Sequence, residues 1–188
     1  MKILVIWSSA NEHGLTGEAK DRFVSGVKAA GLEVEEVWLN SLRMEHCRAC
    51  GNGWGLCREG KCVQDDDFEA LRQKVGAADG IAFISAVYWQ DLTECMKAFL
   101  DRLRRCEAFK PGSLMKGKRC FLAACAGGTG LGAVETLHKL EDTLKHMEMR
   151  ACDRVPVFRF NRDYMLPAME AAGKNYGTKL ISGFDMRY

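Results

Sequence analysis

Five apolar stretches alternate along the chain with segments of helical periodicity, and this alternation limits the possible folds more than any other feature. The apolar stretches lie at 2–7, 34–39, 80–86, 119–126 and 150–160. Apolar residues recur every three or four positions, as in an amphipathic helix, at about 16–30, 65–79, 92–103, 137–147 and 163–182. Strands that are apolar on both faces, each followed by a helix, predict a parallel sheet covered on both sides.

Five such strands suit an α/β, flavodoxin-like doubly wound three-layer sandwich with strand order 2-1-3-4-5. In this order, ligands bind beyond the carboxyl ends of strands 1, 3 and 4. The mixed polarity of the stretch at 34–39 indicates an edge strand. The 188 residues contain no evident linker, repeat or low-complexity segment, so we expect a single domain over 1–188.

Charge and hydropathy narrow the function classes. The formal net charge is only +2, which gives no electrostatic case for nucleic acid or an acidic membrane surface as partner. The longest apolar run, IAFISAVYW, has nine residues, whereas a membrane-spanning helix needs about 20. The amino-terminal ILVIW is shorter than the apolar core of a signal peptide. We therefore expect a cytoplasmic protein whose nine cysteines remain thiols.

Three loops at the predicted strand ends have residues suited to a ligand. The first, WSSANEHGLT at 7–16, offers the hydroxyls of Ser8, Ser9 and Thr16 and opens a helix. Amide groups at a helix N-terminus bind phosphate without a lysine, although the same residues also serve as simple helix caps. The loop is neither a Walker loop nor a GxGxxG motif.

The other two loops favour a flat ring. SAVYWQD at 85–91 places Tyr88 and Trp89 at a strand end, where they can stack on a ring or, alternatively, pack a core corner. CAGGTGLG at 125–132 is rich in glycine, which allows close approach of backbone to a ligand or merely a tight turn. The predicted topology brings all three loops together, and their convergence favours a ligand site.

The run ADGIAFISAVYWQDLTECMKAFLDRL resembles the NAD(P)H-dependent FMN reductases of the flavodoxin-like superfamily, which include the iron–sulfur flavoproteins. Members commonly read A-D, three apolar residues and S-P-V-Y-W, followed by a helix with K-x-F-x-D-R. The first loop resembles their phosphate loop G-S-P-R…G-N-T, and CVQDDDF is similar to their C-V-x-x-D-D. The resemblance covers about residues 1–150.

This resemblance implies a bound FMN. Its phosphate would lie at Ser8, Ser9, His13, Gly14, Leu15 and Thr16, and its isoalloxazine at Ala86, Val87, Tyr88 and Trp89, with Gly127 and Gly128 beside it. Four positions depart from the family pattern: Trp7, Ser9, Leu15 and Ala86 replace glycine, proline, asparagine and proline.

The implied activity is hydride transfer from NAD(P)H to flavin N5, with electrons passed to a quinone, a flavin or another acceptor. In such chemistry the protein supplies position and electrostatics, so no catalytic residue is assigned. The family also implies a homodimer or tetramer. The alternatives are an electron relay between redox proteins and a binding module without a cofactor.

Four cysteines, Cys47, Cys50, Cys57 and Cys62, lie in a loop at about 46–64 with the spacing C-x2-C-x6-C-x4-C. The iron–sulfur flavoproteins bind one [4Fe–4S] cluster through a pattern close to C-x2-C-x2-C-x4–7-C, and Gly53 stands where their third cysteine would be. Cluster ligation needs converging thiolates. Tetrahedral zinc is a second possibility. The favoured interpretation is a structural loop over the flavin edge or a subunit interface.

Overall fold

The structure, a computed structural model, describes residues 1–52 and 55–184. Its parallel strands are β1 (Lys2–Ser8), β2 (Glu33–Trp38), β3 (Gly80–Tyr88), β5 (Arg119–Ala126) and β6 (Arg150–Phe158). Its helices are α1 (Leu15–Ala29), α2 (Phe68–Ala77), α3 (Glu94–Glu107), α4 (Ala133–Lys145) and α5 (Arg162–Ile181). Short 3-10 helices lie at Leu39–Ser41, Leu56–Glu59 and Arg159–Asn161. The predicted alternation of strands and helices is confirmed, with small differences at the ends.

The sheet has the order β2-β1-β3-β5-β6, with parallel pairing throughout. Counted over the parallel strands alone, this is the predicted order 2-1-3-4-5, and β2 lies at an edge as expected. A sixth strand, β4 (Asp91–Leu92), pairs antiparallel with β3 and corrects the prediction of five strands. Two residues are too few to show a periodicity of two, so the sequence pattern does not reveal β4.

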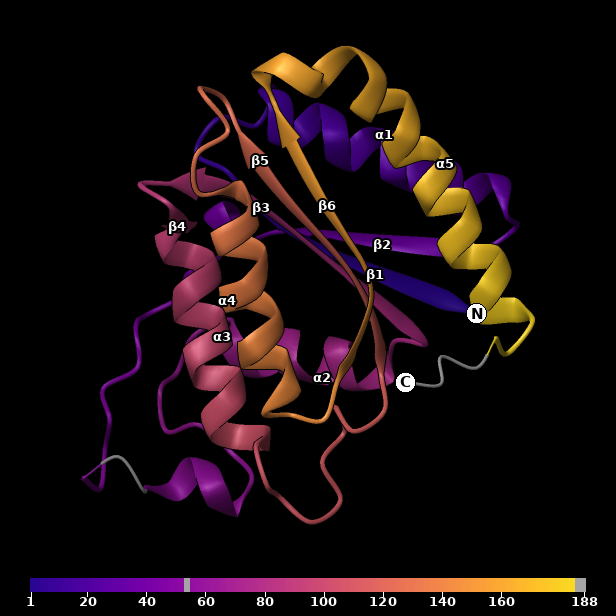
Figure 1. Cartoon of the computed structure of the whole chain (residues 1–188). Helices are drawn as coiled ribbons and strands as arrows, with labels where there is room; N and C mark the ends of the chain where they lie inside the picture. Colours follow the sequence, from indigo (N-terminus) through magenta and orange to yellow (C-terminus); the bar gives the residue numbers. More distant parts are fainter. Residues whose placement is uncertain (53–54, 185–188) are drawn as a thin grey trace.

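Helices cover both faces of the sheet: α1 and α5 lie on one face, and α2, α3 and α4 on the other (Figure 1). Alternate residues of the central strand β3 divide between the two resulting cores. Ile81 and Phe83 belong to the core under α2, α3 and α4, whereas Ala82 and Ile84 belong to the core under α1 and α5. The central strands are therefore buried on both faces, as their continuous apolar runs predict.

In the part of the chain that the structure describes, no helix is both long and apolar enough to cross a lipid bilayer.

Candidate functional site

The loops after β1, β3 and β5 leave the sheet at the same edge. The strand register pairs Ser8 with Ser85 and Ala86 with Cys125, so the last residues of the three strands lie side by side. Figure 1 shows the β4 hairpin and the β5 loop together at this edge, near the start of α1. The three loops singled out in the sequence therefore surround one region of the surface.

The start of the β1 loop is fixed by buried hydrogen bonds. The hydroxyl of the fully buried Ser8 donates to Oδ1 of Asn40 over 3.1 Å, and the Ser9 amide donates to the same oxygen over 3.0 Å. Because the single proton of Ser8 is used on Asn40, the Thr93 hydroxyl, 2.5 Å away, is the donor to Ser8. The Ser8 hydroxyl is thus satisfied within the protein.

Aromatic side chains join this loop to its neighbours. The Tyr88 hydroxyl accepts a hydrogen bond from the Ala10 amide over 2.9 Å, which ties the end of β3 to the β1 loop. The indole of Trp38 donates to the Ser9 carbonyl over 3.0 Å and stacks on Trp7, with ring centroids 5.5 Å apart. Trp7, which departs from the family's glycine, therefore packs the floor of the loop.

Helix α1 begins without a side-chain cap. Gly14 is the N-cap residue, and the chain around it turns so tightly that a Cβ on Gly17 would lie 2.0 Å from the Glu12 carbonyl oxygen. Uncapped amides and the positive end of a helix dipole favour an anion. Thr16 is buried, and its hydroxyl bonds the thiol of Cys125, whose pKa burial raises to about 12. Cys125 is therefore a neutral thiol behind the loop.

The β3–β4 connection is a two-residue hairpin. Tyr88 pairs with Asp91, which leaves Trp89 and Gln90 at the tip with positive φ angles of 48° and 63°. Ala86 is buried and Val87 and Tyr88 are half-buried, but the Trp89 side chain is 99% exposed. Trp89, expected from the sequence beside Tyr88 at the flavin ring, therefore stands at the exposed tip of the hairpin.

The glycines of the β5 loop have two roles. A Cβ on Gly127 or Gly128 would meet no atom within 4 Å, so these residues border open space. Gly132, with φ of +84°, has no room for a side chain because a Cβ would lie 2.3 Å from Cα of Gln90. Lys139 then fixes the hairpin, since its ammonium group donates to the Gln90 carbonyl over 3.1 Å and to Asp91 over 2.7 Å.

The four loop cysteines border one small cavity of about 20 Å³, together with Arg102, Arg105 and Cys106; they are Cys47, Cys50, Cys57 and Cys62. Burial and the nearby thiols raise the pKa of Cys57. The cavity has room for about one water molecule. Among the described residues, no three His, Cys, Asp or Glu side chains are arranged to hold a metal ion. This arrangement does not fit a preformed zinc site or cluster. Gly53 lies outside the described residues.

Arg102 fixes both ends of the cysteine loop. The side chain is 1% exposed and makes a bidentate contact with Asp66, at 2.6 and 2.8 Å. The same guanidinium donates to the Glu45 carbonyl over 2.9 Å and to Sγ of Cys62 over 3.3 Å, and it lies 4.2 Å from the centroid of the Phe68 ring. Burial opposes ionisation of Asp66, but hydrogen bonds from Arg102 and two amides outweigh it and lower its pKa.

Asn40 and Arg102 organise these two regions, and residue-by-residue interpretation of the sequence misses their roles. Asn40 directly follows the apolar stretch at 34–39. The predicted topology puts that strand beside the first strand, and this position was the signal that Asn40 lies near the first loop. Arg102 lies in the K-x-F-x-D-R pattern, but as a charged residue on a helix it would ordinarily face solvent.

The sequence model of the NADPH-dependent FMN reductase family matches residues 1–160. The chain belongs to this family. Its curated relatives include an iron–sulfur flavoprotein of Archaeoglobus fulgidus, 32% identical over 55% of this chain and 46% of that protein. Another is an iron–sulfur flavoprotein of Methanosarcina thermophila, 30% identical over 61% of this chain and 58% of that protein. The chain thus spans about half the length of these relatives.

Solved structures confirm the flavodoxin-like fold of this FMN reductase family member. A flavone reductase superposes with a TM-score of 0.78 at 19% identity, over 100% of this chain and 66% of that chain. The NAD(P)H:quinone oxidoreductase from Methanothermobacter marburgensis gives 0.72 at 19% identity, over 94% and 96%. An archaeal flavodoxin gives 0.64 at 15% identity, over 96% and 99%.

Proposed function

We propose that the chain is a cytoplasmic FMN-dependent oxidoreductase that takes hydride from NAD(P)H and passes electrons to a quinone, a flavin or another small acceptor. The observation that carries this proposal is the meeting of three loops at one sheet edge, with an uncapped helix N-terminus, a tyrosine and two open glycines. These groups fit FMN. Backbone amides at a helix N-terminus suit its phosphate, and the open space beside the two glycines suits its isoalloxazine ring. Bound FMN supplies the hydride-accepting chemistry at its N5 atom.

The phosphate-binding role falls to the turn from the β1 loop into α1. The amides of Leu15 and Thr16 are donors there, whereas the Gly14 amide already donates to the Asn11 carbonyl over 3.3 Å; the exposed His13 lies beside them. Ser9 is buried, and its hydroxyl shapes the turn by donating to the Asn11 carbonyl over 3.0 Å and accepting from the Asn11 amide over 3.2 Å. Ser8 has an indirect role: its hydroxyl is hydrogen-bonded to Asn40 and Thr93, and these bonds position the loop.

The ring-binding role falls to the other two loops. Backbone amides of Ala86, Val87 and Tyr88 run along the end of β3, and Gly127 and Gly128 face open space beside it. Tyr88 is held by its bond to Ala10 and so presents a fixed ring edge. Trp89 stands at the exposed hairpin tip, where it covers a ring or contacts a second protein copy.

Cofactor rebinding tests this function. Purified protein is stripped of flavin and titrated with FMN, and oxidation of NADH and NADPH is followed with a benzoquinone as acceptor. We expect one FMN per chain and oxidation that depends on it. Failure to rebind FMN under native conditions would refute the proposal. Tight FMN binding with negligible oxidation of both nicotinamides would leave a flavoprotein that exchanges electrons with another redox protein.

A second candidate, an electron relay of the iron–sulfur flavoprotein type, is favoured by one observation. All four loop cysteines border the same cavity, and the curated relatives carry that name. A cluster would require the loop to open, given the cavity's size. Iron and acid-labile sulfide are therefore assayed on anaerobically purified protein, with Cys57→Ser against the distant control Cys95→Ser. This candidate is ruled out if the unsubstituted protein contains no iron, or if Cys57→Ser and Cys95→Ser contain equal amounts of iron.

We also propose that a second copy of the chain covers the carboxyl edge of the sheet. Three large apolar side chains from separate loops are exposed there: Trp89 at 99%, Phe160 at 85% and Leu131 at 71%. Large exposed apolar side chains at one edge are typical of an interface. Light scattering on the FMN-loaded protein should give a dimer or tetramer, and Trp89→Ser with Leu131→Ser should weaken it. A monomer at high micromolar concentration would contradict this.

A further inference from the structure

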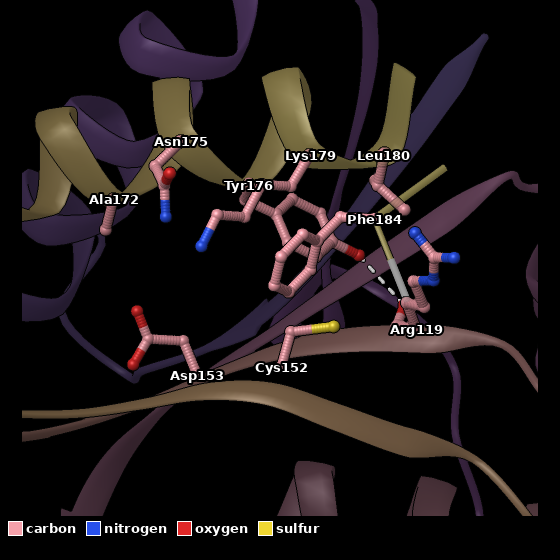
Figure 2. A pocket seen from close by; sticks show the side chains of 9 residues that line it. All are labelled: Arg119, Cys152, Asp153, Ala172, Asn175, Tyr176, Lys179, Leu180 and Phe184. Carbon is pink, nitrogen blue, oxygen red and sulfur yellow. Dashed lines mark hydrogen bonds between the residues drawn. The ribbon is translucent and has the colours of Figure 1, made fainter. Parts of the chain in front are cut away.

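A second cavity, of about 110 Å³, lies between α5 and the amino-terminal halves of β5 and β6 (Figure 2). Arg119, the first residue of β5, borders it, whereas the candidate flavin loop follows Ala126 at the other end of that strand. Seven residue steps of a strand span about 23 Å. The cavity is therefore separate from the site proposed for FMN, and no part of the proposed oxidoreductase chemistry uses it.

An irregularity in β6 shapes one wall. Cys120 pairs with Ala151 and Phe121 with Asp153, so Cys152 is an extra residue in the edge strand, a β-bulge. Consecutive side chains of a regular strand face opposite sides of the sheet, but a bulge changes the aim of the residues around it. As a result, both Cys152 and Asp153 border the cavity. Figure 2 shows the two side chains rising from β6 toward α5.

The end of α5 shapes the opposite wall. Gly183 has a φ of +64° and donates to the Leu180 carbonyl over 3.2 Å, and the Phe184 amide donates to the Lys179 carbonyl over 3.1 Å. This pair of bonds is a Schellman motif, which turns the chain back on the helix. Phe184 consequently borders the cavity, and its ring lies 4.5 Å from the Lys179 ammonium nitrogen.

The interior of the cavity is apolar and ring-sized. Ala172 leaves space on the face of α5, while Leu180 and the ring of Tyr176 form the floor. The Tyr176 hydroxyl accepts from the Ile81 amide over 2.9 Å and donates to the Arg119 carbonyl over 2.8 Å, so Tyr176 offers a ligand only its carbon atoms. An apolar cavity of about 150 Å³ holds a benzene molecule. This one, at about 110 Å³, encloses only part of a single ring or of a short branched chain, and the rest of the ligand extends through the mouth.

The rim carries charges of both signs. Arg119 and Lys179 are cationic and Asp153 is anionic, and within the described part of the chain none of the three joins a salt bridge. Their sum of +1 matches a ligand with one negative charge. A carboxylate suits an ammonium group such as that of Lys179 through a charge-assisted hydrogen bond. Asp153 stands across the cavity from Lys179 (Figure 2) and would repel a second negative charge.

We propose that this cavity is a binding site for small organic monocarboxylates. The ring or branched chain occupies the space between Ala172 and Phe184, and the carboxylate lies at the rim beside Lys179. Arg119, on the other side of the Phe184 ring, adds positive charge to the rim (Figure 2). Dicarboxylates and inorganic phosphate are disfavoured because Asp153 repels their additional charge.

Titration of the FMN-loaded, nitrogen-15-labelled protein with benzoate tests the site, with benzamide as a neutral probe of the same shape. We expect saturable amide shifts confined to the amino-terminal half of β6 and the last two turns of α5. Benzamide should bind about two- to five-fold more weakly, as loss of one exposed ion pair implies. Equal binding of the two probes, no saturation, or shifts at residues 8–16 with release of FMN would each overturn the proposal.

Two variants locate the contacts. Lys179→Gln should weaken benzoate binding by about three- to five-fold, whereas Lys174→Gln, an exposed lysine of the same helix that does not border the cavity, should leave it unchanged. Ala172→Leu fills the interior and should abolish binding. Ala172→Leu can also disturb α5, so the two lysine variants provide a test that does not depend on it. Equal benzoate affinities for Lys179→Gln and Lys174→Gln would refute the contact proposed for Lys179.

Discussion

At the scale of single residues, the buried ion pair between Arg102 and Asp66 has the largest expected consequence. Removing one partner of a buried pair leaves an uncompensated charge and costs about 3–5 kcal/mol. We expect Arg102→Gln to lower the free energy of unfolding by about this amount, measured by urea denaturation, and to expose the cysteine loop to trypsin. The cause is that Asp66, the Glu45 carbonyl and Cys62 lose their common donor.

The neighbouring residue supplies the control for Arg102. Asp101 pairs with Lys97 one turn away over 2.5 Å, and both side chains are largely exposed. An exposed helix pair contributes only about 0.3–0.5 kcal/mol. Asp101→Asn should therefore leave stability and loop proteolysis nearly unchanged. Equal losses in Arg102→Gln and Asp101→Asn would show that the buried pair does not hold the loop.

Gly17 permits the tight turn at the proposed phosphate site. Because a Cβ there would lie 2.0 Å from the Glu12 carbonyl oxygen, Gly17→Ala must push the β1 loop away from α1. We expect FMN affinity to fall at least about ten-fold, roughly the loss of one charge-assisted hydrogen bond, measured by fluorescence titration.

Gly26→Ala separates this local effect from a loss of fold. It introduces a similar clash in the same helix, 2.0 Å from the Glu170 carbonyl oxygen of α5. Both variants should be less stable, so they are titrated below their unfolding transitions. We expect FMN affinity to be unchanged in Gly26→Ala and reduced in Gly17→Ala. Equal FMN affinities in the two variants would mean that the phosphate binds elsewhere.

At the scale of elements, the β3–β4 hairpin keeps an unfavourable turn. A two-residue hairpin prefers Asn-Gly because both positions need positive φ, yet Trp89 and Gln90 occupy them. Such residues cost about 1 kcal/mol or more each. Replacing them together by Asn-Gly should raise the free energy of unfolding by about 1–2 kcal/mol while lowering NAD(P)H oxidation, since the exposed indole is lost.

Trp89→Ala isolates the contribution of the ring in this hairpin. It removes the indole, but both turn positions still carry a residue with a Cβ at positive φ, so the backbone strain remains. We expect little gain in stability and the same loss of oxidation. If Asn-Gly gives no stabilisation by chemical denaturation, the contacts from Lys139 and the Gly132 backbone already offset the strain.

The elements themselves were predictable because their signals are local. Continuous apolar runs and a 3.6-residue period identify strands and helices without reference to the rest of the chain. The second helix shows the limit of this reasoning: the predicted stretch begins at Asp65, but Asp66 accepts the Phe68 amide over 3.2 Å, so the helix begins only at Phe68. The exposure of Trp89 depends on the short hairpin, which has no periodic signal.

The organising contacts of the candidate sites were not predictable residue by residue. Asn40 bonds Ser8 from 32 positions away, and Arg102 reaches Asp66 across 36 positions. The α5 cavity depends on a bulge at Cys152 and on the turn at Gly183 that follows α5, neither of which has a periodic signature. The predicted topology therefore indicated where the loops meet, whereas the residues that fix those loops could be identified only from the structure.

At the scale of the whole molecule, one ion pair attaches the outer helix α4 to the edge strand β6 and makes stability depend on pH. Glu141 accepts two hydrogen bonds from Arg154, both at 2.5 Å, and its side chain is only 10% exposed. These bonds lower the pKa of Glu141 from 4.5 to about 2. A carboxyl group with a lowered pKa stabilises the fold fully above its unfolded pKa and loses that contribution as pH falls toward the folded value.

The stabilisation from Glu141 should therefore be present at pH 7 and disappear between about pH 4.5 and pH 2. Allowing for the partial exposure of Arg154, we expect Glu141→Gln to lower the free energy of unfolding by about 2 kcal/mol at pH 7 and by much less near pH 2.5. Urea denaturation at several pH values measures the difference. Asp142→Asn, at an exposed position one residue further along α4, should show almost no difference at any pH. A Glu141→Gln deficit that stays constant down to pH 2.5 would mean that the pair contributes through packing rather than charge.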